Sequence, residues 1–190
     1  MLLRRTLPTD PSRPRGARGL TLIEVTISMA VMTIAMAMFS GVITTTTRIG
    51  SEKRLASVAS HAARSQLERL RCQPFAQVWR LYNENPADDP AGAGTGPGPH
   101  FEVPGLEPLK GDADGFVGRV VLPHVGTALL ENGVDEDFGL PRDLNGDTLI
   151  DERDHAGDYA ILPVKVELEW DTPLGPRRLE MHTMLAGYGS

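Results

Sequence analysis

The stretch "RGLTLIEV", residues 18–25, leads into a long apolar run and places one glutamate, Glu24, near its head. From Val25 to Ile43 there are 19 residues without an ionisable side chain. As an α-helix this run is about 28 Å long, close to the ~30 Å hydrocarbon core of a bilayer. The sequence therefore predicts one membrane-spanning helix. Placing a carboxylate in the bilayer costs several kcal/mol, so Glu24 at the head of this helix needs an explanation.

The charge of the chain is unevenly distributed. Residues 1–19 contain five of the 19 basic residues and one of the 25 acidic residues, so the part that follows is acidic. Positively charged flanks stay on the cytoplasmic side of a membrane, which predicts that the body of the protein faces outward. An acidic body also disfavours a nucleic-acid partner. The arginines of the basic segment are Arg4, Arg5, Arg13, Arg15 and Arg18.

An ordinary secretory signal is one interpretation of this region. It would use residues 20–34 as its apolar stretch and "AMA", residues 35–37, as the small-x-small cleavage site near Ala37. This interpretation leaves Glu24 unexplained, and it cuts through an apolar pattern that continues as "MFSGVI". It predicts a secreted protein that begins at Met38.

The second interpretation explains the glutamate. "RGLTLIEV" followed by an uncharged apolar helix resembles the cleavage and methylation motif of type IV prepilins and type II secretion pseudopilins. The resemblance implies that a prepilin peptidase cuts after Gly19 and removes a basic leader, residues 1–19, and that Leu20 becomes N-methylated. The usual first residue of the mature family members is phenylalanine, and leaders are often shorter than 19 residues.

The resemblance also implies a role for Glu24. After cleavage, the Leu20 amine and the helix dipole both favour an anion in the first helical turn. The family-derived hypothesis is that Glu24 pairs with the Leu20 amine of a neighbouring subunit during filament assembly. The alternative is a carboxylate that merely lies among lipid headgroups. Expected partners are other pilin or pseudopilin subunits, prepilin peptidase and the inner-membrane assembly machinery. The protein is expected in the bacterial inner membrane, single-pass with a periplasmic C-terminal domain, and then in a pilus or pseudopilus.

Helical periodicity continues beyond the apolar run. Apolar residues recur at helical spacing from Leu55 to Leu70 while basic residues occupy other faces, which predicts that the helix extends toward Pro74. Residues 75–84 favour one or two further helical turns. We therefore expect an assembly helix over 20–44, its continuation into the globular domain over 45–84, and a loop-rich domain over 85–190. Residues 85–99, rich in proline and glycine, predict a loop.

Strand signals come late in the chain. "FVGRVVLP", residues 116–123, is a short candidate, and "YAILPVKVELEW", residues 159–170, alternates apolar and charged residues, as a strand with one buried face does. "DTPLGP" predicts a turn, and "RRLEMHTML" alternates again, which predicts an antiparallel hairpin. The expected fold class is α+β: a long N-terminal helix packed on a small antiparallel sheet, which is pilin-like.

The acidic loop "DLNGDTLIDERD", residues 143–154, resembles a calcium loop. Thr148 replaces the glycine of an EF-hand and no pair of flanking amphipathic helices is evident, so this is not an EF-hand proper. The D-x-N-G-D opening with a terminal aspartate is closer to dockerin-like repeats, but these use two such segments and this sequence has one. The alternative is an acidic, solvated turn. The predicted ligands are Asp143, Asn145, Asp147, the backbone carbonyl of Leu149, Asp151 and Asp154, with calcium as the expected cofactor because it prefers oxygen donors.

The sequence disfavours an enzyme. The five histidines show no H-x-x-x-H spacing, and neither a nucleophile elbow nor a phosphate-binding loop is present. The only cysteine, Cys72, excludes an intrachain disulfide. The predicted function is a minor pilin or minor type II secretion pseudopilin. The alternative is a secreted calcium-dependent binding protein with a conventional signal peptide.

Overall fold

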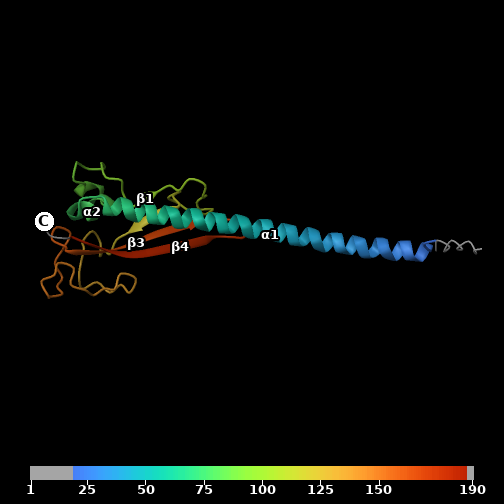
Figure 1. The fold of residues 1–190 in the computed structure, drawn as a ribbon. Coiled ribbons are helices and arrows are strands. Elements are labelled where there is room, and N and C mark those ends of the chain that lie inside the picture. The colour runs from blue at the N-terminus through green and yellow to red at the C-terminus, as the bar shows by residue number, and fades with distance from the viewer. Residues whose placement is uncertain (1–18, 188–190) are drawn as a thin grey trace, which may run out of the picture. The chain divides into compact units, whose positions relative to one another are not determined.

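The computed structural model describes residues 19–187 of this chain, and its contacts divide the chain into two compact units, Met1–Thr46 and Thr47–Ser190. Helix α1 runs from Leu22 to Arg71, 50 residues (Figure 1). It ends just before Pro74, where the helix was predicted to stop, and α2 follows over Phe75–Tyr82. The predicted loop over residues 85–99 contains only a single 3₁₀ turn, Pro86–Asp88.

Four antiparallel strands form one sheet in the order β1-β2-β3-β4. Their bounds are His100–Phe101, Gly118–Val121, Ile161–Trp170 and Arg177–Ala186. Strands β3 and β4 pair along their whole length, with Val166 opposite Met181, so the predicted hairpin is confirmed. Together, the long helix and the small antiparallel sheet confirm the α+β, pilin-like fold.

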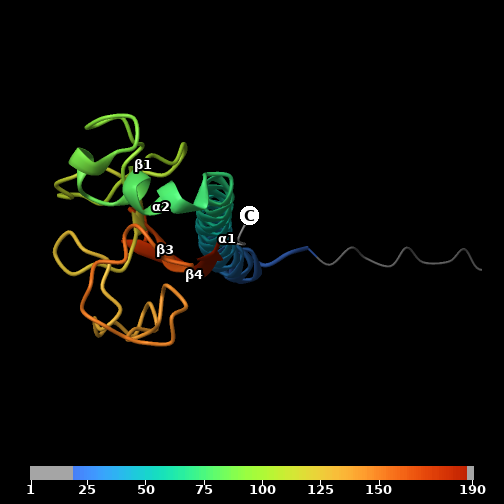
Figure 2. The same ribbon diagram turned by 90° about the vertical axis from the view of Figure 1, so that its left-hand side faces the viewer.

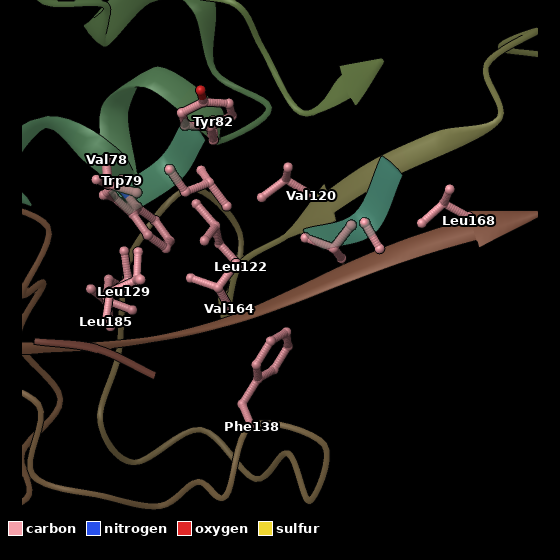
Figure 3. Close-up of a cluster of buried hydrophobic side chains, with 14 of the residues drawn as sticks. Val78, Trp79, Tyr82, Val120, Leu122, Leu129, Phe138, Val164, Leu168 and Leu185 are labelled. Atoms are coloured by element: carbon pink, nitrogen blue, oxygen red, sulfur yellow. The ribbon is translucent and has the colours of Figure 1, made fainter. Parts of the chain in front are cut away.

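The second half of α1 contributes a narrow buried stripe to the core of the larger unit. Ala59, Ala63, Gln66 and Leu70 recur every three or four residues and are buried, as one face of a helix requires. The two alanines let the helix backbone approach its neighbours closely. Ala59, Ala63 and Leu70 belong to one apolar cluster with residues of α2 and the sheet. Figure 3 shows Val78 and Trp79 of α2 close to Leu122 and Val164.

Strand β3 is buried on both faces, so the predicted single buried face is wrong. The side chains of Lys165 and Glu167 are both less than 10% exposed. The Lys165 Nζ lies 2.9 Å from Asp137 Oδ2 and 5.8 Å from the centre of the Phe138 ring, and both partners belong to the segment between β2 and β3. Figures 2 and 3 show this segment on the side of β3 opposite α2. Because a long connection covers the second face, a strand with a half-exposed pattern becomes central in the core.

One buried hydroxyl ties that long connection to α2. The Tyr159 hydroxyl donates to the Phe75 carbonyl oxygen at 2.5 Å and accepts from the Trp79 backbone N–H at 3.2 Å. Tyr159→Phe removes both contacts in a buried place, so we expect a loss of about 1–3 kcal/mol in the free energy of unfolding. The measurement is chemical denaturation of the full chain in detergent. Tyr82→Phe is the control and should change stability little, and an equal loss in both variants would contradict the assigned role.

Candidate functional site

The head of α1 is built by a local capping pattern. Thr21 precedes the first helical residue, and its Oγ1 accepts a hydrogen bond from the Glu24 backbone N–H at 3.3 Å. A threonine at the N-cap with a glutamate three residues later is the sequence of a capping box. Gly19 and Leu20 lie outside the helix and are exposed. The structure thus places the proposed cleavage point in accessible chain directly before a helix.

Glu24 lies in the first turn of α1, where the helix dipole favours an anion. Within residues 19–187 its carboxylate has no ion-pair partner, and Glu24 is exposed. The residues around it are apolar and exposed as well: Leu22 is 85% exposed and Ile23 is 67% exposed. The described part of the chain thus supplies no cation for Glu24.

The apolar half of α1 meets the requirements of a membrane span. An 18-residue window of the helix has a mean hydropathy of 2.0, and none of it is buried against the rest of the described chain. Two of its hydroxyl groups bond inside the helix: Ser28 Oγ donates to the Glu24 carbonyl oxygen at 2.7 Å, and Thr33 Oγ1 donates to the Met29 carbonyl oxygen at 2.8 Å. Such internal bonds remove the cost of placing these groups in hydrocarbon. By length and composition alone, a signal sequence passes the same test.

The acidic loop is organised around Asp143, Asn145 and Asp147. Asp143 accepts the backbone N–H groups of Gly146 and Thr148 at 2.6 and 2.7 Å, through different carboxylate oxygens. Asn145 Oδ1 accepts the Asp147 N–H at 2.9 Å, and Asp147 accepts the Leu149 N–H at 2.8 Å. The Leu149 N–H is also the main cause of the lowered pKa of Asp147. Asn145 Nδ2 also donates to Asp147 Oδ2 at 3.1 Å, so two of the three side chains are in contact.

Thr148 has a φ of 71°, a left-handed conformation that costs energy for a residue with a branched side chain. It occupies the position where an EF-hand loop has glycine. The Thr148 backbone therefore adopts the conformation that the sixth position of such a loop needs, although the residue type is unfavourable for it.

The other predicted ligands point elsewhere. Asp154 Oδ1 accepts the backbone N–H groups of Leu129 and Ala156, both at 3.0 Å. Asp151 contacts Arg153, with 2.6 Å between Arg153 Nε and Asp151 Oδ2. The Arg153 backbone N–H and guanidinium lower the pKa of Asp151 to about 2. Arg153 Nη2 also lies 3.8 Å from Asp147 Oδ2, so this arginine neutralises part of the charge of the loop.

Two functional candidates were missed by sequence reasoning, Glu131 and His155. Glu131 is 1% exposed and accepts the backbone N–H groups of Leu144 and Asn145, at 2.6 and 3.1 Å. His155 is also 1% exposed, and its Nε2 lies 3.1 Å from Asp151 Oδ1. Burial acts to lower the pKa of His155, but its hydrogen bonds to Asp151 and Asp158 outweigh burial and raise it. Glu131 carries no local motif, so only the fold reveals its place beside the loop.

A family model matches the N-terminal part of the chain. Residues 14–40 match the model of the prokaryotic N-terminal methylation motif, and this match includes Gly19, Leu20 and Glu24. No curated protein and no solved structure matches the chain. The match covers the head and the apolar half of α1 but none of the sheet. Residues 14–40 therefore carry the prokaryotic N-terminal methylation motif, which is the type IV pilin signal.

Proposed function

We propose that this chain is a minor pilin or minor type II secretion pseudopilin that acts by assembly. Prepilin peptidase would cut it after Gly19, Leu20 would be methylated, and the inner-membrane assembly machinery would add it to other subunits of a pilus or pseudopilus. One observation carries the proposal. The methylation motif lies on the head of a helix whose apolar side chains the described chain leaves exposed.

Exposed apolar surface on this scale needs a partner. Large side chains from Leu20 to Ile43 are 37–85% exposed, which is unfavourable in water. A bilayer would cover them before assembly, with the larger unit in the periplasm, and neighbouring helices would cover them inside a filament. The unpaired Glu24 is consistent with this transfer from bilayer to filament, because the Leu20 amine of a neighbouring subunit would neutralise it as the helices pack together.

The larger unit favours a minor subunit over a bulk one. Between β2 and β3 the chain inserts residues 122–160, which include the acidic loop and cover one face of the sheet. A subunit repeated throughout a filament gains from compact surfaces, whereas one placed at a tip or in an initiating complex can carry such an insertion.

The mass of the mature chain tests this proposal against the alternative of a conventional signal peptide. We expect a chain that begins at Leu20 and carries one extra methyl group, measured by intact mass and N-terminal sequencing of the membrane fraction. A chain that begins at Met38 would overturn the pilin proposal and favour a secreted protein.

We further propose that the acidic loop, residues 143–154, binds calcium through Asp143, Asn145, Asp147, the Leu149 carbonyl, Asp151 and Asp154. The support is the loop backbone, whose N–H groups bond to the side chains of Asp143, Asn145 and Asp147 and whose Thr148 has the required φ. The predicted ligands are all oxygen donors, the kind that calcium prefers. Asp151 and Asp154 would have to turn from their present contacts to reach the ion.

Calcium should therefore stabilise the full chain in detergent. The expected gain is RT ln(1 + [L]/Kd), about 2.7 kcal/mol at a hundredfold excess of calcium over Kd. Asp143→Ala with Asp147→Ala should abolish this gain, as measured by thermal unfolding with and without calcium. The control is Asp112→Ala with Glu136→Ala, which removes the same charge outside the loop and should keep the gain. If millimolar calcium leaves the wild-type melting temperature unchanged, the loop is a solvated turn.

A further inference from the structure

A second group of metal-ligand atoms lies beside the acidic loop and differs from it in chemistry. Glu131, Asp151 and His155 each offer one ligand atom, and these atoms all lie within 4.8 Å of one another. Two of the three residues are 1% exposed, Glu131 and His155. A solvated acidic turn does not bury a glutamate and a histidine together, because burying charged and polar groups costs energy unless they are paired.

Each of the three side chains is held by its other polar atom. Glu131 Oε1 accepts the backbone N–H groups of Leu144 and Asn145. Asp151 Oδ2 accepts from Arg153 Nε at 2.6 Å, and His155 Nδ1 lies 3.0 Å from Asp158 Oδ1. The atoms left to face one another are Glu131 Oε2, Asp151 Oδ1 and His155 Nε2. Two of these atoms also accept a hydrogen bond from the backbone. Asp151 Oδ1 accepts from the Arg153 N–H at 2.8 Å, and Glu131 Oε2 accepts from the Asp151 N–H at 3.4 Å.

The contact between His155 and Asp158 is of the kind found around metal-binding histidines. A ligating histidine usually donates its second ring N–H to a carboxylate, which orients the ring and raises its basicity. Asp158 is placed to accept that hydrogen bond at Nδ1. Both ring nitrogens lie within hydrogen-bond distance of a carboxylate, Nδ1 of Asp158 and Nε2 of Asp151. A metal ion would displace the proton from Nε2 and take its place between the imidazole and the carboxylates of Asp151 and Glu131.

The distances fit a small cation. Nε2 lies 3.1 Å from Asp151 Oδ1 and 3.6 Å from Glu131 Oε2. Tetrahedral bonds of 2.0–2.1 Å to zinc place neighbouring ligand atoms about 3.3 Å apart, between these two distances. We propose that Glu131, Asp151 and His155 bind a divalent transition-metal ion of the zinc class, with water completing the coordination. Calcium is disfavoured because it prefers oxygen ligands throughout, whereas an imidazole nitrogen suits zinc.

This centre overlaps the proposed calcium loop at Asp151, for which the two ions would compete. Glu131 and His155 belong only to the zinc centre, whereas Asp143 and Asp147 belong only to the calcium loop. Glu131 also holds the backbone at Leu144 and Asn145, at the start of the acidic loop. A metal on Glu131 would therefore fix both ends of that loop, and it would do so whether or not the chain assembles into a filament.

The test is zinc binding by the full chain, purified in detergent without a histidine tag. We expect one zinc ion per chain in equilibrium dialysis without added calcium. Glu131→Gln and His155→Gln should each weaken zinc affinity about a hundredfold or more, and Asp158→Asn, which changes only the support of the ring, about 10–100-fold. Glu131→Gln keeps an oxygen for the Leu144 and Asn145 N–H groups, so the loop should retain its backbone contacts.

The controls separate this centre from other sites. His61→Gln changes an exposed histidine on α1, and Asp143→Ala with Asp147→Ala removes only calcium ligands, so both should keep zinc affinity. X-ray absorption of the zinc-loaded wild type should show one imidazole and oxygen ligands at about 2.0–2.1 Å. The proposal is overturned if Glu131→Gln and His155→Gln bind zinc as the wild type does, or if the absorption spectrum shows no imidazole. The spectrum decides the question even if a variant fails to fold.

Discussion

Gly19→Val is expected to leave the chain uncut in the membrane with its arginine-rich leader attached. Gly19 is exposed, and a side chain built there would meet no neighbouring atom, so the folded chain should tolerate valine. The peptidase would meet a branched side chain at the bond it must cut. Processing should thus fail while folding is preserved. Intact mass of the membrane fraction should show the precursor in place of the mature form.

A matched control distinguishes an effect at the cleavage site from an effect of any substitution in the leader. Gly16→Val places the same side chain three residues upstream and should be processed to Leu20 like the wild type. Normal maturation of Gly19→Val would remove the main support for processing by a prepilin peptidase. That result would instead indicate that α1 is a membrane anchor or a signal sequence that is cleaved at another position.

Glu24→Gln is expected to be processed normally and then to fail in assembly. Glutamine keeps the size of the side chain and the T-x-x-E/Q capping pattern, so the helix head should be unchanged. If Glu24 neutralises the Leu20 amine of an adjacent subunit, the substitution leaves one charge unpaired in an apolar filament core. Removing one partner of a buried ion pair costs about 3–5 kcal/mol. The protein should therefore accumulate in the inner membrane.

The measurement compares sheared filaments with membrane fractions. Glu24→Asp retains the charge on a shorter side chain and should restore part of the incorporation, whereas Glu102→Gln, an exposed site outside α1, should behave as the wild type. Equal incorporation of Glu24→Gln and wild type would mean that the carboxylate makes no assembly contact. That outcome would fit a carboxylate among headgroups, or a tip subunit with no neighbour ahead of it.

Much of the fold follows from local sequence. The α1 span is encoded by 19 residues without an ionisable side chain, and its head by Thr21 and Glu24 three residues apart. The β3–β4 hairpin is encoded by period-2 alternation on both sides of "DTPLGP". These features depend on residues close together in the chain, because helical bonds, caps and tight turns join near neighbours. The motif that identifies the chain is of the same local kind.

The position of the long connection between β2 and β3 was decided only by the tertiary structure. A charged residue at every second position predicts a solvated face for β3, yet Lys165 and Glu167 are covered because Asp137, Arg119 and Arg178 supply partners from elsewhere. The hydroxyl of Tyr159 reaches α2 across 84 residues of sequence.

The proposed zinc centre shows the same division. The sequence by itself marked residues 143–154 as an acidic loop with spaced oxygen donors, and Asp151 was among its candidates. Glu131 lies 20 residues before Asp151, in a segment without a motif, and His155 is one of five histidines without metal-ligand spacing. Glu131, Asp151 and His155 come together only because the connection between β2 and β3 folds back on itself. In this fold the backbone N–H groups of Leu144, Asn145 and Asp151 donate to the Glu131 carboxylate. Contacts between distant segments are chosen by burial and by pairing of polar groups across the whole unit, so a short sequence pattern determines the helix and hairpin but not this centre.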